Sequence, residues 1–521
     1  MNRAITINNL AKLEHLTAVA PYTSDPTELF HALCEKKSDS LLLESAEINS
    51  KENLQSLLVI DSALRIVCHG NSVTFTALSQ NGVNVLNHIV QNIPSCVSYS
   101  VDEATLTIDF PKIKDDLDED SKIKELSVFD ALRLVQHSFD TSNQHKHALF
   151  LGGLFAYDLV ANFEPLGSAS RIDNCPDYVF YLAETLVTVD HQTNACDVQA
   201  SLFIDDASEK RRLEQRIEDI VKHCERPVSL PPAINVTDLN LNCSLSDKDF
   251  SELVSGLKHY VIQGDVFQVV PSRRFSLPCP SPLVAYKKLK QSNPSPYMFF
   301  MQDEHFTLFG ASPESALKYD VMSNQVEIYP IAGTRHRGKR KDGQIDLDLD
   351  GRIELELRTD KKENAEHMML VDLARNDIAR ISQPGTRHVA DLLKVDRYSH
   401  VMHLVSRVVG QLRHDLDALH AYQACMNMGT LTGAPKVRAM QLIRQVEKTR
   451  RGSYGGAVGY LTGEGNFDTC IVIRSAYVEN GIAHVQAGAG VVFDSDPQAE
   501  TDETRGKAQA VISAIQAAHK E

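Results

Sequence analysis

The chain has 521 residues, of which 43% are hydrophobic and 23% charged, a composition typical of ordinary globular proteins. Its formal net charge of −16 disfavours nucleic acid and anionic lipid as partners, so an anionic small molecule would need a locally basic pocket. The 10 cysteines include no Cys-x-x-Cys pair, which argues against a zinc site or a disulfide framework and favours a reducing, cytoplasmic location. No apolar run approaches the ~20 residues of a membrane span.

The first part of the chain predicts antiparallel hairpins with a helix between them. Residues 56–78 and 185–204 each contain two β-type runs separated by a polar turn. Residues 127–139 have the apolar periodicity of a helix. We expect residues 1–225 to form an N-terminal region built on these elements.

Residues 226–245 are predicted to be a linker, because prolines and asparagines interrupt any helical period. A helix should follow, with Ser246 as its N-cap, Asp249 in the capping-box position and Gly264 as its end. Its predicted apolar face consists of Phe250, Leu253, Leu257 and Val261. Residues 246–521 are expected to form a second domain.

The second domain repeats the mixture of strands and helices. Residues 296–311 form a strand, a polar turn and a strand. The elements do not alternate strictly as strand, helix and strand, and there is no internal repeat or Gly-rich phosphate loop. We therefore expect an α+β fold, with a large antiparallel β-sheet core flanked by helices and a smaller N-terminal subdomain.

Two predicted helices in this domain carry paired glutamates. Glu363 and Glu366 are three residues apart and project from one face. Glu500 and Glu503 repeat the spacing near the C-terminus, and Lys507 follows one turn later. If the pairs converge they suit Mg²⁺, which prefers oxygen ligands. The same spacing is common on solvated helix faces, so it leaves both interpretations open.

Other motifs favour an anionic ligand. Gly488, Ala489 and Gly490 break a strand, and small residues suit either an anion-binding nest of N–H groups or a β-bulge. Arg474 stands in an otherwise apolar predicted strand, where it needs either a ligand carboxylate or an internal salt bridge. Tyr454 lies among glycines, which suits a phenol exposed in a pocket.

Two further segments supply polar side chains. A turn leads into a basic helix, with Thr430 at its mouth and Pro435 at the predicted first helical position. His400 and His403 are candidates for proton transfer, or ordinary histidines whose bonds are satisfied by the fold. Together these motifs suggest a dicarboxylate site, with one carboxylate on Mg²⁺ and the other on the arginine, tyrosine and glycines.

A series of ordered motifs gives the chain a close resemblance to the chorismate-utilising enzymes. The motifs are LLLESAEI, GDVFQVVPSRRF, GASPES, IYPIAGTR, EHMMLVDLARND, VDRYSHVMHLVS, MGTLTGAPKVRAM, RRGSYGGAVGY, DTCIVIRS, VQAGAGVV and ETDETRGKA. The resemblance implies that ammonia adds to the ring of chorismate as the ring hydroxyl leaves, after which pyruvate is eliminated and the ring becomes aromatic.

The resemblance also implies roles for individual residues. Glu366 and Glu503 would bind Mg²⁺, with Glu363 and Glu500 supporting it through water. The substrate would be bound by Gly333, Thr334, Tyr454, Arg474, Gly488, Ala489, Gly490 and Lys507. The expected catalytic residues are His403, which would assist pyruvate loss, Glu314 and Thr430, which would handle the leaving hydroxyl, and Gln268.

Two positions distinguish the expected reaction from those of similar enzymes. Aminodeoxychorismate synthase has a nucleophilic lysine at the position of Ala332, and isochorismate and salicylate synthases have a water-activating lysine at that of Gln268. Neither a methyl group nor a neutral amide can replace these lysines, so ammonia is expected to attack directly and to give the ortho product. Two alternatives remain: aminodeoxychorismate synthase, which Ala332 disfavours, and a non-catalytic tryptophan-sensing subunit, which would not need the glutamate pairs.

The same resemblance implies a partner and a regulator. The chain has no Gly-x-Cys-x-Gly elbow, so a separate glutamine amidotransferase subunit is expected to supply ammonia, in a heterotetramer of two of each chain. The N-terminal region would be regulatory and would bind tryptophan together with part of the second domain. The residues expected to bind it are Glu44, Ser45, Pro296, Tyr297 and Met298, although an edge strand and a core aromatic would give the same pattern.

Overall fold

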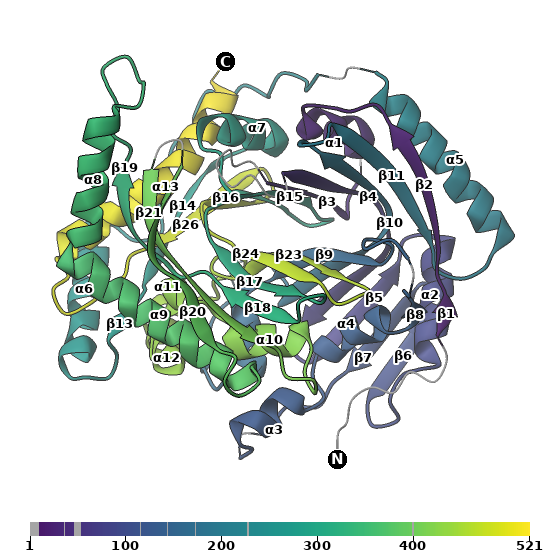
Figure 1. Cartoon of the computed structure of the whole chain (residues 1–521), viewed down its shortest axis with the longest axis horizontal. Helices are drawn as coiled ribbons and strands as arrows, with labels where there is room; N and C mark the ends of the chain where they lie inside the picture. Colours follow the sequence, from purple (N-terminus) through teal and green to yellow (C-terminus); the bar gives the residue numbers. More distant parts are fainter. Residues whose placement is uncertain are drawn as a thin grey trace.

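The computed structural model describes residues 10–35, 37–45, 54–114, 116–142, 144–171, 173–226, 229–398 and 401–520. Most strands in these ranges join one continuous antiparallel network, with helices around it (Figure 1). Two short pairs stand apart from the network: β1 (Ala11–Lys12) with β8 (Phe139–Asp140), and β13 (Gln268–Val269) with β22 (Gly433–Ala434). The predicted antiparallel sheet core is therefore confirmed.

Two long strands, β4 (Gln55–His69) and β10 (Tyr178–Asp190), organise the network. They pair along their whole lengths, and register shifts at Leu182, Ala183 and Thr185 interrupt the ladder. Such bulges bend and twist a strand. The two halves of each strand consequently pair with different neighbours, as expected where two packed sheets share strands at a corner.

The first sheet extends from the first half of β4 and the second half of β10. Beyond β4 it contains β3 (Ser40–Glu44), β15 (Tyr297–Gln302), β16 (Thr307–Ser312), β25 (Ser475–Glu479), β26 (Ile482–Gly488), β14 (Ser272–Pro278) and β12 (Asn242–Cys243). Beyond β10 it contains β11 (Ala195–Leu202) and β2 (Glu14–Ala20).

The second sheet extends from the other halves of the same strands. Beyond β4 it contains β5 (Ser72–Ala77), β7 (Thr105–Asp109) and β6 (Ser98–Asp102). Beyond β10 it contains β9 (Phe150–Phe155), β23 (Ala457–Thr462), β24 (Phe467–Ile471), β17 (Ser315–Asp320), β18 (Gln325–Ile328) and β21 (Val401–Gln411), which also pairs with β19 (Ile331–His336) and β20 (His388–Arg397).

Each sheet joins a block of strands from the N-terminal part of the chain to a block from the C-terminal part. In the first sheet β3 pairs with β15, and in the second β9 pairs with β23. Neither sheet is complete without strands from both sides of the expected linker. The division into residues 1–225, 226–245 and 246–521 stays a prediction.

The helices lie outside the sheets, and most of the buried apolar side chains form three layers. They are α1 (Pro26–Cys34), α2 (Gln80–Val90), α3 (Glu119–Lys124), α4 (Phe129–Gln136), α5 (Ala207–Cys224), α6 (Asp247–Ile262), α7 (Pro282–Ser292), α8 (Leu347–Thr359), α9 (Lys361–Ile381), α10 (Ala418–Cys425), α11 (Gly429–Thr432), α12 (Lys436–Glu447) and α13 (Pro497–His519). One layer packs α1, α5, α7 and α13 on the first sheet, a second packs α2, α4, α9 and α10 on the second sheet, and a third lies between the sheets. None of the helices in the described ranges is long and apolar enough to cross a bilayer.

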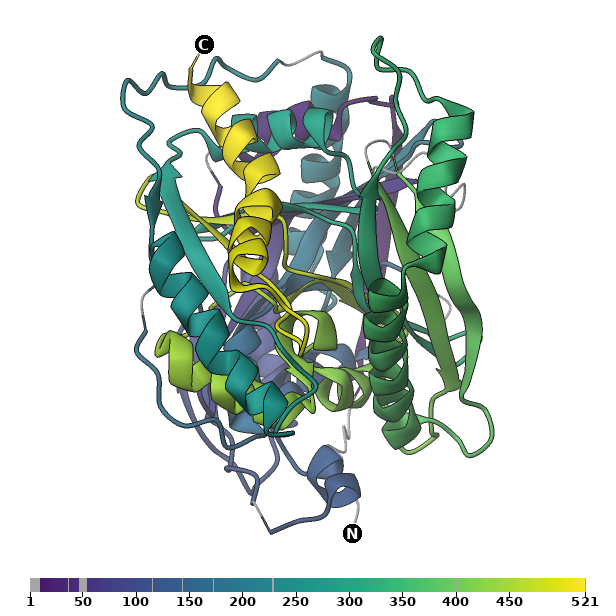
Figure 2. The ribbon, with the colours of Figure 1, turned by 90° about the vertical axis from the view of Figure 1, so that its left-hand side faces the viewer.

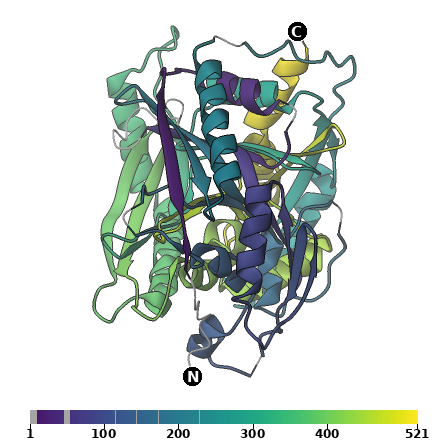
Figure 3. The same ribbon diagram turned by 90° about the vertical axis from the view of Figure 1, so that its right-hand side faces the viewer.

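The views from either side separate two groups of helices. Figure 2 shows α13 in yellow and α8 and α9 in green on one side of the molecule, and Figure 1 agrees with this placement. Figure 3 shows α5 and α2 on the opposite side, where α5 packs on β11 and β2. The helices that carry the paired glutamates therefore share one side.

The start of α6 agrees with its sequence pattern. The Ser246 side chain accepts a hydrogen bond from the Asp249 N–H, and Gly264 has the positive φ of 83° that ends the helix. Val254 is buried in place of Leu253, which is only partly buried. The helix α12 begins one residue later than predicted: its first residue is Lys436, and Pro435 is its N-cap.

Candidate active site

The glutamates of α9 and α13 converge. Burial raises the pKa of Glu366, and the negative charges of Glu363 and Glu503 add to this rise. Burial likewise raises the pKa of Glu500 to about 7, with the charge of Glu503 contributing. Carboxylates affect one another in this way only when they are close in space. The two pairs therefore form one cluster, although their role as ligands stays a prediction.

Lys507 connects this cluster to the glycine segment after β26. Its Nζ lies 2.6 Å from Oε1 of Glu503 and donates to the carbonyl of Gly488 at 3.1 Å. Burial favours the neutral form of Glu503, but Lys507 outweighs it and the pKa of Glu503 is lowered. Glu503 is consequently ionised at neutral pH, while Glu500 beside it is only partly so.

The oxygens of this cluster fit a magnesium ion. Oε1 of Glu366 is buried without a hydrogen-bond partner, and the Nζ of Lys362 is 3.8 Å away. An orphaned carboxylate oxygen of this kind suits a bound cation. Among the described residues no group of three or more His, Cys, Asp or Glu is arranged so that it could hold a metal ion by itself. Magnesium does not need one, because it commonly takes one or two carboxylates with water and a substrate oxygen.

Gly488 and Gly490 allow side chains to approach the backbone closely. A Cβ on Gly488 would lie 3.0 Å from the hydroxyl of Tyr454, and one on Gly490 would lie 2.4 Å from Nε2 of Gln268. Ala489 between them is fully buried. Tyr454 is buried, contrary to the exposed phenol expected from its glycine neighbours, because its ring packs into the core and leaves the hydroxyl at Gly488.

The apolar neighbours of Arg474 predicted that it lies inside a strand, but the structure places it between two strands. β24 ends at Ile471, β25 begins at Ser475, and Arg474 between them has a φ of 50°. A non-glycine residue in this left-handed region stores strain of the kind that clusters at functional sites. Its guanidinium makes no hydrogen bond or ion pair with the part of the chain that the structure describes. The internal salt bridge that the sequence left open is therefore absent from these residues.

Three other predicted residues are close enough to Arg474 to affect its charge. Burial lowers its pKa, and Tyr454, Glu503 and Glu314 partly offset that effect. Arg474 is half-buried, so its guanidinium is partly removed from water without a paired carboxylate to replace the water. A substrate carboxylate would supply this pairing with a bidentate contact.

The ring-facing residues lie on neighbouring strands. Thr334 of β19 is opposite His403 of β21, and its Oγ1 is 3.0 Å from Nδ1 of the histidine. The carbonyl of Gly333 is 3.3 Å from the same nitrogen. Burial lowers the pKa of His403 to about 4, so the imidazole is neutral at pH 7. His400 lies outside the described residues.

Glu314, Thr430 and Gln268 complete the set of predicted catalytic residues. Glu314 lies in the turn between β16 and β17, where burial raises its pKa to about 8 against the opposing effects of Thr430, Lys507 and Arg474. A carboxyl group that is protonated at pH 7 can act as an acid. Gln268 on β13 has a buried Oε1 without a hydrogen-bond partner among the described residues, so this oxygen is available to a ligand.

The motifs did not single out an ion pair that holds these groups together. Arg451 is buried with its guanidinium carbon 5.5 Å from the centre of the Tyr454 ring. It donates hydrogen bonds of 2.7 Å to the carbonyls of Leu431 and Val270, which lie on the segments that carry Thr430 and Gln268. One buried guanidinium thus fixes three ligand-facing segments.

The partner of Arg451 extends the connection to the glycines. Glu447 pairs with Arg451 at 2.7 Å and accepts hydrogen bonds from the N–H and hydroxyl of Ser272 at 2.9 and 2.8 Å. Ser272 is the register partner of Gly488 in the β14–β26 ladder. In the sequence, the only sign of this ion pair is that Arg450 and Arg451 precede a glycine. That pattern alone does not reveal which of the two arginines is buried.

Replacing Arg451 with lysine should raise KM for the substrate by about 10-fold or more, since lysine keeps the charge but loses fork hydrogen bonds worth about 1.5–3 kcal/mol each. The change in kcat should be smaller. Steady-state kinetics measure both. Arg438→Lys is the matched control, because Arg438 is an exposed residue of α12 paired with Asp265. An unchanged KM in Arg451→Lys would remove the positioning role.

The five residues predicted to bind tryptophan line one cavity of about 570 Å³, a size typical of small-molecule sites. It lies between the sheets, where Glu44 of β3 is the register partner of Met298 of β15. The carboxylate of Glu44 is already engaged, because Tyr286 and Lys290 of α7 donate to its two oxygens. Binding of tryptophan here stays a prediction.

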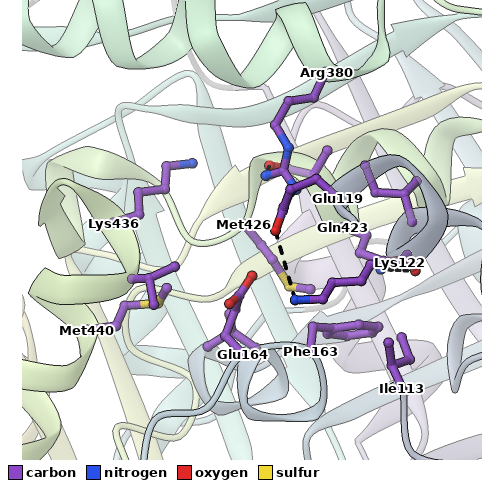
Figure 4. A pocket seen from close by; sticks show the side chains of 14 residues that line it. Ile113, Glu119, Lys122, Phe163, Glu164, Arg380, Gln423, Met426, Lys436 and Met440 are labelled. Atoms are coloured by element: carbon purple, nitrogen blue, oxygen red, sulfur yellow. Dashed lines mark hydrogen bonds and ion pairs between the residues drawn. The ribbon is translucent and has the colours of Figure 1, made fainter. Parts of the chain in front are cut away.

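A smaller hollow of about 60 Å³ lies between α3, α9 and α12, away from the predicted residues (Figure 4). Its charged side chains are paired: Arg380 with Glu119, and Lys436 with Asp377 at 2.6 Å. A space of this size holds a few water molecules. It is therefore not a candidate for the substrate site.

Comparison with known proteins identifies the family of the chain. The family model described as chorismate binding enzyme matches residues 83–513. Anthranilate synthase component 1 of Vibrio parahaemolyticus is 73% identical over 521 residues, which cover 100% of this chain and 96% of that protein. The protein of the same name from Escherichia coli is 60% identical over 507 residues, covering 97% of this chain and 98% of its own.

Two solved structures share the fold. Anthranilate synthase component I from Streptococcus pneumoniae has a TM-score of 0.67 at 28% identity and covers 89% of this chain and 93% of its own. The menaquinone-specific isochorismate synthase of Escherichia coli has a TM-score of 0.69 at 16% identity, covering 98% and 96%, which shows the fold alone. From the family match and the full-length identities, the chain belongs to the chorismate-binding enzymes and, within them, to the anthranilate synthase component 1 family.

Proposed function

We propose that the chain converts chorismate and ammonia into anthranilate, pyruvate and water, the first step of tryptophan biosynthesis. The observation that carries this proposal is the proximity of the two glutamate pairs to Arg474, a half-buried arginine that has no paired carboxylate among the described residues. Chorismate carries two carboxylates on one molecule. The cluster and the arginine provide one position for each.

Each group has a chemical task in this reaction. Bound Mg²⁺ would be held by Glu366 and Glu503 and would supply Lewis-acid stabilisation at the ring carboxylate and the leaving hydroxyl. Arg474, Tyr454 and the backbone at Gly488–Gly490 bind the pyruvyl carboxylate, which fixes the ring against Gly333 and Thr334. This orientation makes the subsequent chemistry effectively unimolecular.

Two residues would transfer protons in this reaction. Glu314 is protonated at neutral pH and donates a proton to the departing hydroxyl, with Thr430 beside it. His403 is neutral at neutral pH and assists the loss of pyruvate. Gln268 supplies an amide that cannot activate water, and Ala332 cannot act as a nucleophile, so ammonia is the group that attacks.

The reaction should show an alkaline limb set by Glu314. Because its pKa is raised to about 8, the acid form predominates below that pH and is lost above it. We expect kcat/KM for chorismate to fall as the pH rises through about 8. Glu314→Gln should lower the rate and remove this limb. If the alkaline limb persisted unchanged in Glu314→Gln, the limb would have to come from another ionisable group.

The activity is measured through the fluorescence of anthranilate. The purified chain, mixed with chorismate, Mg²⁺ and ammonium, should form anthranilate, whereas glutamine in place of ammonium should give none. This outcome follows from the proposal that a glutamine amidotransferase subunit supplies ammonia, in a cytoplasmic heterotetramer of two of each chain. Glutamine-dependent turnover by the single chain would contradict the partner. Failure with ammonium would contradict the activity itself.

Regulation by tryptophan is part of the proposal. Supporting it, all five residues expected to bind tryptophan line one cavity between the two sheets. Glu44 anchors the edge of this cavity to α7, and α7 packs against α13, which carries Glu500 and Glu503. A ligand that binds one arrangement of these helices more tightly would shift the population towards it.

A further inference from the structure

The cavity between the sheets contains a row of charged residues that the predicted tryptophan-binding set does not include. Lys318 of β17 is opposite Asp468 of β24, and Asp468 is opposite Tyr460 of β23. Residues opposite each other in an antiparallel sheet share a face. All three line the same cavity as Tyr297 and Met298. A cation, an anion and an aromatic ring therefore stand side by side on one wall.

The carboxylate of Asp468 in this row has unused hydrogen-bond capacity. It accepts one hydrogen bond, from the hydroxyl of Tyr297 at 3.2 Å, and forms no ion pair within the described ranges. An ionised carboxylate has about four acceptor positions. Burial raises its pKa to about 6, with Lys318 opposing, so it is mostly ionised at pH 7. A cationic ligand group would satisfy it.

Lys318 is a suitable complement to Asp468. It makes no direct hydrogen bond or ion pair with a residue that the structure describes. It is flanked across the strands by Glu327 as well as Asp468. Glu327 already pairs with Arg407 at 3.2 Å, which leaves the ammonium of Lys318 available to an anion in the cavity.

Glu44, one of the residues expected to bind tryptophan, is a poorer anchor for a cation than Asp468. Its Oε2 accepts from Tyr286, and its Oε1 accepts from Lys290 at 2.6 Å and from Ser56 at 3.4 Å. A ligand ammonium would have to displace the lysine. The bonds of Glu44 instead fix β3 to α7.

We propose that Asp468 binds the ammonium group and Lys318 the carboxylate of an amino-acid ligand in this cavity, with its aromatic side chain against Tyr297, Met298 and Tyr460. Adjacent charges of opposite sign complement a zwitterion, whereas a ligand with only one charge leaves one wall group unpaired. Tyr460 stacks on Phe150 with ring centres 5.1 Å apart, so its ring is held in place. The inference rests on the proposed regulation by tryptophan and names the chemistry of that site.

Three probes separate the two charges: L-tryptophan, tryptamine, which lacks the carboxylate, and indole-3-propionate, which lacks the ammonium. The chain contains no tryptophan, so excitation at the red edge of indole absorption reports the ligand without protein background. Titrations use the full chain. Asp468→Asn should weaken L-tryptophan and tryptamine by about 10- to 100-fold, since hydrogen bonds to charged groups are worth about 1.5–3 kcal/mol, and leave indole-3-propionate within about twofold.

Lys318→Gln should give the reciprocal result, weakening L-tryptophan and indole-3-propionate but not tryptamine. Asp320→Asn is the control, because Asp320 lines the same cavity and its carboxylate is bonded to Ser323. Normal L-tryptophan binding by Asp468→Asn, or equal loss of all three probes, would overturn the assignment while leaving regulation intact. Absence of L-tryptophan binding by the unmodified chain would instead overturn the proposed regulation and the inference with it.

Discussion

Replacing Glu503 with glutamine should lower kcat/KM for chorismate by about 10²–10³-fold, because Lewis-acid stabilisation is worth several kcal/mol and each 1.36 kcal/mol is a factor of ten. Glutamine keeps the shape of the side chain and removes the charge. Excess Mg²⁺ should recover part of the loss, since the remaining carboxylates still attract the cation. Anthranilate fluorescence at increasing Mg²⁺ concentration measures both effects.

The control for this variant is Asp502→Asn. Asp502 is the exposed neighbour of Glu503 on α13 and bonds to Gln498 one turn earlier. The substitution Asp502→Asn removes the same charge from the same helix without altering the glutamate cluster. Activity should stay within about twofold, as for ordinary surface changes. If Glu503→Gln showed the same activity and the same Mg²⁺ dependence as Asp502→Asn, a role for Glu503 at the metal would be ruled out.

Replacing His403 with alanine should reduce kcat by about 10²–10⁴-fold, the usual contribution of a positioned acid or base. The dissociation constant for chorismate should change little, because the carboxylates of the substrate are bound by other residues. Steady-state kinetics and direct chorismate titration separate the two quantities. The neutral imidazole, held by Thr334 and Gly333, is already in the form that accepts a proton.

An exposed histidine provides the matched control for His403. The exposed imidazole of His388 on β20 bonds only to the nearby Thr386 carbonyl among the described residues, at 3.0 Å, and His388→Ala should retain normal turnover. Thermal unfolding of both variants checks that the fold is intact. Normal turnover by His403→Ala, or an equal loss in both variants, would exclude the proposed role.

Local sequence patterns predicted individual elements well. The hairpins β4–β5 and β10–β11 lie where alternating runs with polar turns placed them, and Ser246 caps α6 as expected. These signals succeed because they depend on neighbours in the chain. The break at Arg474 was missed for a physical reason: apolar residues on both sides suggested one strand, and no glycine marks its left-handed backbone.

The arrangement of the site depended on information that spacing does not contain. The glutamate spacing showed that each pair shares a helix face, but the proximity of Glu366 on α9 to Glu503 on α13 depends on how distant segments fold together. The burial of Arg451 and the cross-strand position of Asp468 likewise depend on distant segments. Resemblance to a family supplied the candidate residues. The structure showed how these residues are paired, including that the guanidinium of Arg474 has no partner among the described residues.

The most direct test of the account is binding of Mn²⁺, as a spectroscopic substitute for Mg²⁺, followed by electron paramagnetic resonance with and without chorismate. The account predicts that chorismate tightens binding of the cation to the unmodified chain and fails to do so when Glu366 and Glu503 are both replaced by glutamine. Undiminished, chorismate-dependent Mn²⁺ binding in that double variant would contradict it.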